Sequence, residues 1–176
     1  MQQNPHARRS WRKLHIGLDA ETGRIVASAL TTKDVDDAAQ VGPLLDQVAG
    51  AVALFTADGA YDQNSTYADV AQRYPDAAVV VPPRSTAVPS ETAESTPTQR
   101  DRHLQCIAEH GRRGWQKRSG YNTRARAEAA MARWKQVIGD GLHSHTDKRR
   151  ATEVAVAVHV LNRMLDLGRP ISVRIA

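Results

Sequence analysis

One stretch without glycine or proline, residues 121–135, predicts a helix and constrains the fold more than any other feature. Alanine, arginine, glutamate, methionine and lysine dominate this stretch, and all of them favour the helical state. At about 100° per residue, Tyr121, Arg124, Glu128 and Lys135 fall within an arc of roughly 60°. A second arc is apolar and can face a core; its members are Ala127, Ala130, Trp134, Val137 and Ile138. The helix therefore carries a packing face and, separately, a line of polar side chains.

The chemistry of that polar line suggests a binding surface. It contains one aromatic ring, two cations and one carboxylate. Two cations and a ring can hold a phosphate backbone, and a carboxylate beside them can hold a divalent metal. The alternative is a solvated helix whose charges only serve solubility, and the spacing alone leaves both interpretations open.

A second carboxylate follows a short apolar strand predicted at residues 52–57. The composition is that of a strand buried inside a sheet, and Asp58 comes directly after its last residue. The carboxyl ends of strands are where α/β sheets usually bind ligands. Asp58 is therefore a candidate ligand-binding residue, the alternative being an aspartate that caps a turn.

The order of the predicted elements indicates an α/β fold. Residues 11–31 alternate in the manner of a β-hairpin, with a turn that ends at Gly23. Strands at 52–57 and 77–81 enclose a helix, which favours a parallel or mixed sheet with helices on its faces. The predicted helices outside residues 121–135 cover 35–48, 64–74 (with Asn64 or Ser65 as the cap), 99–109 and 150–167. We expect one domain over residues 1–176, with an exposed loop rich in Pro, Ser, Thr and Ala at 82–99.

Positive charge is concentrated in one part of the chain. Residues 1–98 hold 8 Lys/Arg and 12 Asp/Glu, whereas residues 99–150 hold 13 and 5. The formal net charge of +5 therefore arises around the predicted helix at 121–135. A basic segment on an otherwise acidic chain indicates a polyanion partner, although a merely soluble basic surface has the same composition.

The single cysteine, Cys106, excludes an internal disulfide and suits a reducing compartment. The chain shows no signal peptide and no apolar run long enough to cross a bilayer, so we expect a cytoplasmic protein without a membrane partner. Phosphate-binding loops, dinucleotide fingerprints and zinc-binding cysteine pairs are also missing from the sequence.

The polar line of the helix also has a specific pattern, Y-x2-R-x3-E-x6-K, filled by Tyr121, Arg124, Glu128 and Lys135. This pattern resembles the C-terminal signature of bacterial insertion-sequence transposases of the DDE class. Four other segments look like parts of the same family: Trp11–Asp19, Thr31–Ala38, Ala57–Asp62 and Leu161–Asp166. The second of the family's catalytic aspartates corresponds to Asp58, so the resemblance covers nearly the whole chain.

The resemblance implies a ribonuclease-H-like fold, in which helices flank a mixed sheet. It implies that Asp58 and Glu128 are catalytic and bind Mg2+, in a site where two aspartates and one glutamate hold two ions. It also implies that Tyr121, Arg124 and Lys135 bind double-stranded DNA at transposon ends. The implied activity is DNA transposition by strand cleavage and transfer, and the implied partners include a second copy or an intact transposase.

The chain departs from the family pattern at the first catalytic aspartate, which the family carries on a strand before the hairpin. Ten residues precede Trp11, and none of them is Asp or Glu. Asp19 is the first carboxylate, but it falls in the predicted hairpin turn. The resemblance therefore implies the C-terminal part of a catalytic core, without its first strand and inactive alone. Two alternatives are a non-catalytic DNA-binding regulator and a remnant of an insertion element.

A metal site at His143 and His145 is a weaker candidate.

Overall fold

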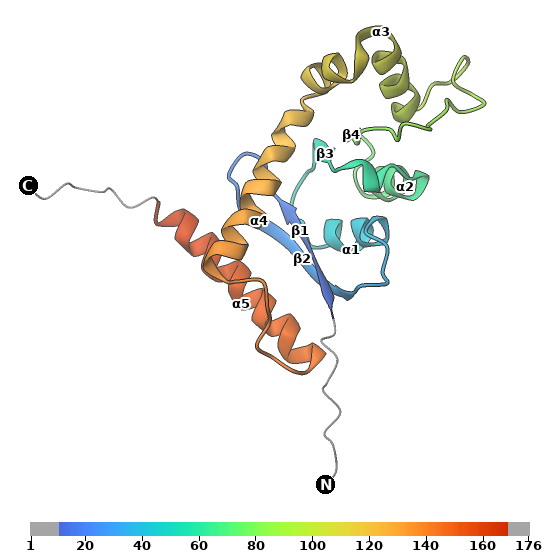
Figure 1. Ribbon diagram of the computed structural model, residues 1–176. Helices are drawn as coiled ribbons and strands as arrows, with labels where there is room; N and C mark the ends of the chain where they lie inside the picture. Colours follow the sequence, from blue (N-terminus) through green and yellow to red (C-terminus); the bar gives the residue numbers. More distant parts are fainter. Residues whose placement is uncertain (1–10, 169–176) are drawn as a thin grey trace, which may run out of the picture.

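The computed structural model describes residues 11–168 and has the α/β character that the sequence predicts (Figure 1). Its strands are β1 (Arg12–Leu18), β2 (Ile25–Thr32), β3 (Leu54–Thr56) and β4 (Ala78–Val80). Its α-helices are α1 (Val41–Leu45), α2 (Asn64–Arg73), α3 (Gln99–Ser119), α4 (Ala125–Val137) and α5 (Asp147–Asp166). Short 3-10 helices lie at η1 (Ala38–Gln40), η2 (Gly59–Tyr61) and η3 (Tyr121–Arg124).

The predicted N-terminal hairpin is confirmed. Strands β1 and β2 pair antiparallel, with Arg12 opposite Thr32. The Asp19 carboxylate closes the turn by accepting from the Glu21 amide at 2.8 Å. Gly23 completes it with φ 74°, a conformation that glycine adopts without a steric penalty.

The helix predicted at residues 35–48 is much shorter than expected. The chain forms η1 and then the five-residue α1. Pro43 explains the interruption, because it has no amide hydrogen to donate to the carbonyl four residues earlier. In addition, the Val35 carbonyl accepts from Lys13 Nζ at 2.8 Å, so a side chain satisfies it in place of a helical amide.

Strands β3 and β4 form the predicted strand–helix–strand unit with α2 between them. They pair in parallel, with Phe55 opposite Val79. Helix α2 confirms the predicted helix, but its N-cap is Gln63 rather than Asn64 or Ser65. The predicted burial of β3 is wrong: Leu54 is 43% exposed, and the other two residues of the strand are only half-buried.

The described strands do not join into the one parallel or mixed sheet that the sequence favours. Within residues 11–168, β1 pairs only with β2, and β3 pairs only with β4. Both pairs are thus complete two-stranded sheets, and no described strand is left to pair with β1 and β3 at once. The inner edges, meaning the unpaired edges of β1 and β3, also receive no hydrogen bond from a side chain of the described residues.

The outer edge of β2 is covered by side-chain amides. The Ser28 amide donates to Gln47 Oε1 at 3.1 Å. Asn162 of α5 brackets Ile25, accepting from its amide at 2.9 Å and donating to its carbonyl at 2.8 Å. These bonds replace those of a neighbouring strand.

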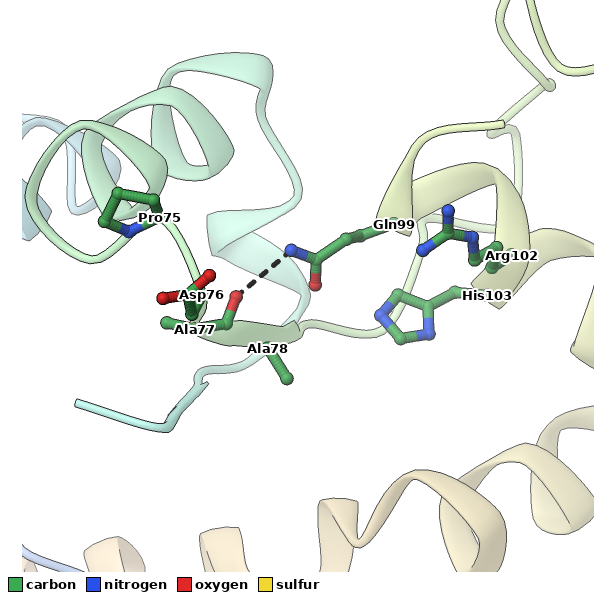
Figure 2. A pocket seen from close by; sticks show the side chains of 7 residues that line it. All are labelled: Pro75, Asp76, Ala77, Ala78, Gln99, Arg102 and His103. Carbon is green, nitrogen blue, oxygen red and sulfur yellow. Dashed lines mark hydrogen bonds between the residues drawn. The ribbon is translucent and has the colours of Figure 1, made fainter. Parts of the chain in front are cut away.

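The outer edge of β4 is covered in the same way by α3. Gln99 accepts from the Val79 amide at 2.7 Å and donates to the Ala77 carbonyl at 3.1 Å, the bond drawn in Figure 2. The Val79 carbonyl is bonded to His103 Nε2 at 2.7 Å. Side chains therefore bond part of both outer edges, in contrast to the inner edges of β1 and β3.

Helix α3 is longer than predicted and runs up to Gly120. Gly111 interrupts it with φ 69° and ψ 168°, and a helical segment resumes after this kink. Gly120, with φ 73°, then turns the chain into η3 and α4. The predicted helix at 121–135 therefore exists, but its first turn is 3-10 helical.

Two clusters of buried side chains hold these elements together. In Figure 1, α4 and α5 lie beside the β1–β2 hairpin, and Trp134, Leu161 and Ile25 form the buried centre of that contact. The second cluster joins α1 and α2 to the β3–β4 pair, with Val70 and Val79 among its buried members. Trp134 confirms the apolar face predicted for residues 121–135, whereas Val137 of the same predicted face is 42% exposed.

Candidate active site

Asp58 lies at the carboxyl end of β3, as the sequence predicts. It is the N-cap of η2, and its Oδ1 accepts from the Ala60 amide at 2.9 Å. Its Oδ2 lies 3.5 Å from Arg124 Nη2. The two interpretations of this aspartate are therefore compatible, because one oxygen caps a turn while the other faces η3.

Arg124 joins Asp58 to Glu128. Arg124 Nη1 lies 2.5 Å from Glu128 Oε1, one helical turn further along the chain. Two carboxylates 70 positions apart thus contact one guanidinium. Both remain accessible, since the Asp58 side chain is 43% exposed and the Glu128 side chain 62%.

Tyr121 lies beside the same group. Its ring packs against Trp115 with centroids 5.3 Å apart. Partial burial raises the pKa of Tyr121, and the charges of Asp58 and Glu128 act in the same direction, whereas Arg124 opposes them. The tyrosine is therefore a neutral hydroxyl near neutral pH, next to two anions and one cation.

A pair of aromatic side chains that sequence reasoning missed anchors Tyr121. Trp115 is 1% exposed, and its Nε1 donates to His103 Nδ1 at 3.0 Å. The His103 ring meets Trp115 edge-on and also bonds β4 through Nε2. The signal was present, because Trp115 is the one large apolar residue between Ile107 and Tyr121.

Lys135 is not part of this contact group. Its position seven residues after Glu128 places it about two helical turns, or about 10 Å, along the same face of α4. Its side chain is exposed and makes no ion pair within residues 11–168. The structure thus gathers Asp58, Arg124, Glu128 and Tyr121, and leaves Lys135 at a distance.

A comparison with known families places the chain in one of them. A family model described as Transposase DDE domain matches residues 2–165. The chain belongs to the DDE transposase family. No solved structure matches the chain.

A third acidic ligand is missing from the site in the described part of this transposase domain. Asp19 uses both carboxylate oxygens within its own turn, accepting from Glu21 and Thr22. No group of three or more His, Cys, Asp or Glu side chains able to hold a metal occurs among residues 11–168. Asp19 is therefore not gathered with Asp58 and Glu128.

Asp62 of the transposase domain has a structural position. It is 6% exposed and accepts from Arg100 Nε at 2.7 Å and from the Arg84 amide at 2.9 Å. Burial raises the pKa of Asp62, but these hydrogen bonds outweigh burial and hold the pKa below its ordinary value. This buried ion pair fixes the loop after β4 to α3.

The histidine pair is a poor metal site in this transposase domain. The amides of His143 and Ser144 donate to the two carboxylate oxygens of Glu153, both at 2.8 Å. These bonds order the loop before α5 through its backbone. Both Glu153 oxygens are therefore used in these hydrogen bonds, and Glu153, His143 and His145 do not form a metal-binding cluster.

The donor set of the transposase domain fits one hard divalent cation. DDE transposases use divalent metal ions, and Mg2+ is commonly bound by one or two carboxylates that substrate phosphates and waters complete. Asp58 Oδ2 and Glu128 Oε1 supply two such oxygens around the position that the Arg124 guanidinium contacts. A second ion would need a further acidic ligand.

A hollow of about 310 Å3 between α3 and the start of β4 lies outside this site. Figure 2 shows Gln99, Arg102 and His103 of α3 across from the segment around Asp76. Gln99 and His103 already bond the edge of β4, so the hollow marks a packing contact of the transposase domain. Separately, no helix within residues 11–168 has the length and apolar character needed to cross a membrane.

Proposed function

We propose that this transposase domain acts in DNA transposition by metal-dependent cleavage and transfer of DNA strands. The observation that supports the proposal most strongly is the convergence of Asp58 and Glu128 on Arg124. Asp58 and Glu128 are the proposed catalytic residues and metal ligands. Tyr121, Arg124 and Lys135 are the proposed contacts to double-stranded DNA.

Each side chain has a defined part in this proposal. Asp58 and Glu128 hold Mg2+, which supplies Lewis-acid activation of a phosphodiester and of the attacking hydroxyl. Arg124 and Lys135 bind DNA phosphates, Lys135 about two helical turns from Glu128. The Tyr121 ring packs against Trp115. This contact fixes the start of η3, and so helps to hold Arg124, at the end of η3, beside the two carboxylates.

We further propose that the domain is an incomplete ribonuclease-H-like unit. The inner edges of β1 and β3 lack partner strands among the described residues, whereas the outer edges of β2 and β4 are covered. A strand between β1 and β3 would join the two sheets into one mixed sheet. If this strand carried an aspartate, it would supply the missing third carboxylate, and an intact transposase could provide it.

The first experiment measures metal binding, because binding does not require catalysis. Mn2+ titration followed by electron paramagnetic resonance should detect one weak site in the chain, lost in Asp58→Asn and in Glu128→Gln. Asparagine keeps the oxygen that caps η2, so the turn survives the substitution. Asp140→Asn is the control, since Asp140 is an exposed carboxylate outside the site. Unchanged Mn2+ binding in both site variants would refute the ligand assignment.

The second experiment measures cleavage of a labelled transposon-end duplex. The 176-residue chain alone should not nick the duplex with Mg2+ or Mn2+, since two-metal chemistry needs ligands for both ions. Fusion of an Asp-bearing strand ahead of β1 should restore some nicking, and Asp58→Asn should abolish it. Nicking by the chain alone that depends on Asp58 would contradict the proposed incompleteness.

A non-catalytic DNA-binding regulator is the second candidate function. It is favoured by the lack of a third acidic side chain near Asp58 and Glu128 in residues 11–168. A regulator should bind duplex DNA and inhibit an intact transposase without ever cleaving. Restoration of nicking by the added strand would favour the catalytic role, whereas inhibition alone would favour the regulator.

A further inference from the structure

The second half of α3, after the kink at Gly111, presents a strongly basic surface. Arg112, Arg113, Lys117 and Arg118 are all exposed, and we call these four residues the α3 basic surface. Trp115 between them is buried. At about 100° per residue, Arg113 and Lys117 lie about 160° from Trp115, so they point away from the body of the protein.

None of these four cations has an acidic partner within residues 11–168. Other arginines of the chain do pair, as Arg73 does with Asp46 and Arg100 with Asp62. Like charges one helical turn apart, as at Arg113 and Lys117, destabilise a helix. Cations near a helix C-terminus are favourable, which accounts for Lys117 and Arg118 but not for the two arginines next to the kink.

The α3 basic surface is firmly connected to the candidate active site. Only Gly120 separates α3 from η3, where Tyr121 and Arg124 lie. The Trp115 ring packs on Tyr121 at 5.3 Å, and Trp115 also bonds His103. Figure 1 shows α3 followed along the chain by α4, with only η3 between them.

We infer that the α3 basic surface binds the phosphates of duplex DNA beyond those held by Arg124 and Lys135. This surface is assigned to DNA on the basis of the proposed function, whose substrate is duplex DNA. Its side chains are long, exposed and without a recognition pocket, so their contacts are with the backbone and carry no sequence preference. The surface lengthens the bound duplex on one side of the catalytic group.

The test compares two variants that lose equal charge. Arg113→Ala/Lys117→Ala removes two cations of the α3 basic surface. Lys148→Ala/Arg149→Ala removes two exposed cations from the start of α5. Binding of a labelled duplex of arbitrary sequence is followed by fluorescence anisotropy between about 50 and 200 mM salt. Circular dichroism checks helicity, which alanine favours at all four helical positions.

In the Arg113→Ala/Lys117→Ala variant, the slope of log K against log salt should become shallower by about 1.8, or about 0.9 for each lost phosphate contact. The Lys148→Ala/Arg149→Ala variant should keep the slope of the unmodified chain. Equal loss in both variants would overturn the assignment, because net charge alone would then explain binding.

Two further outcomes separate this surface from the proposed function. In the first, Arg124→Ala/Lys135→Ala flattens the slope while Arg113→Ala/Lys117→Ala leaves it unchanged. In that case the α3 basic surface does not bind DNA, whereas the proposed DNA substrate is retained. If the unmodified chain fails to bind duplex DNA but binds polyglutamate through Arg113 and Lys117, the occupant is an acidic polypeptide. That result would overturn both the surface assignment and the DNA contacts of the proposed function.

Discussion

At the scale of single residues, Arg124 contacts both proposed metal ligands through one guanidinium. The group lies 2.5 Å from Glu128 and 3.5 Å from Asp58. A cation bound by the same oxygens has to displace this guanidinium. In the proposed site, Arg124 would therefore compete with the metal when DNA is absent, and a DNA phosphate that draws Arg124 away would favour metal binding.

Arg124→Ala should tighten Mn2+ binding in the absence of DNA. Exposed ion pairs contribute about 0.2–1 kcal/mol each, so loss of two contacts should raise the affinity by about 2- to 30-fold. Electron paramagnetic resonance titration measures the change, and Arg126→Ala is a control, since Arg126 contacts the Glu21 carbonyl instead. Weaker Mn2+ binding by Arg124→Ala would rule out competition.

His103 has one tautomer that satisfies both of its neighbours. Trp115 Nε1 can only donate, so His103 Nδ1 accepts and His103 Nε2 carries the hydrogen toward the Val79 carbonyl. His103→Phe keeps a ring against Trp115 but leaves these two buried groups unpaired. We expect a loss of about 1–3 kcal/mol in the free energy of unfolding, measured with urea.

The matched control is His110→Phe on the same helix. His110 is exposed and its nearest charged partner is Glu109 at 3.7 Å, so little stability should be lost there. An equal loss in both variants would mean that the bonds of His103 are energetically unimportant.

The sequence identified Asp58 and Glu128 because each has a recognisable setting along the chain. Their contact through Arg124 was not predictable in detail, since spacing along one helix says nothing about the distance to another segment. Trp115 was missed for a related reason: it follows the kink at Gly111, which interrupts the helical periodicity, so its only signal was that it is a lone large apolar residue in a polar stretch.

At the scale of elements, the start of α3 depends on one buried carboxylate. Thr98 and Asp101 form a capping box, in which each side chain bonds the backbone amide of the other. Asp101 also accepts from the amide and the hydroxyl of Ser90, both at 2.8 Å. One side chain therefore fixes both the helix start and the loop that precedes it.

Asp101→Asn should reduce the acid sensitivity of the fold. Hydrogen bonds from Ser90 and Thr98 hold the pKa of Asp101 well below its ordinary value of 3.8. The stability that depends on this carboxylate is therefore present above about pH 4 and is lost as the pH falls toward the folded-state pKa. Urea unfolding at pH 7, 5 and 3 should show less loss on acidification in the variant than in the unmodified chain.

The same experiment needs a carboxylate that makes no such bonds. Asp140→Asn is suitable, because Asp140 is exposed and follows α4. If Asp140→Asn and Asp101→Asn changed the acid response equally, the buried bonds of Asp101 would not explain it.

Element by element, the sequence was informative where local chemistry decides. The hairpin, α2, α5 and the position of Asp58 after β3 agree with their predictions. The helix predicted at 35–48 was too long, because its apolar spacing favours a helix whereas Pro43 lacks the amide hydrogen that a continuous helix needs. The helix predicted at 99–109 was too short, because Gly111 bends α3 and does not end it.

At the scale of the whole molecule, side chains of α3, α5 and the segment after α1 cover the outer edges of β2 and β4. Gln99 forms two bonds with β4, and Asn162 forms two with β2. The division into two sheets could not be predicted, because strand patterns indicate that strands exist but not which edges they share.

Gln99→Leu should expose the edge of β4. It leaves the Val79 amide and the Ala77 carbonyl unpaired, so we expect faster hydrogen exchange at Val79 and a loss of about 1–3 kcal/mol in unfolding free energy. Gln105→Leu is the control, since Gln105 bonds only the exposed Glu109. Unchanged exchange at Val79 in Gln99→Leu would contradict this role.

The covered outer edges also limit how the protein can aggregate. Fibrils grow when each added chain offers a fresh strand edge to the next chain. In this molecule Asn162 and Gln99 already saturate backbone groups on the two outward-facing strands. A strand inserted between β1 and β3 would be held on both sides and would present no new edge. Further strand addition would then be confined to the part of the β2 edge beyond Ser28, so we expect assembly to favour a complex with one inserted strand per chain.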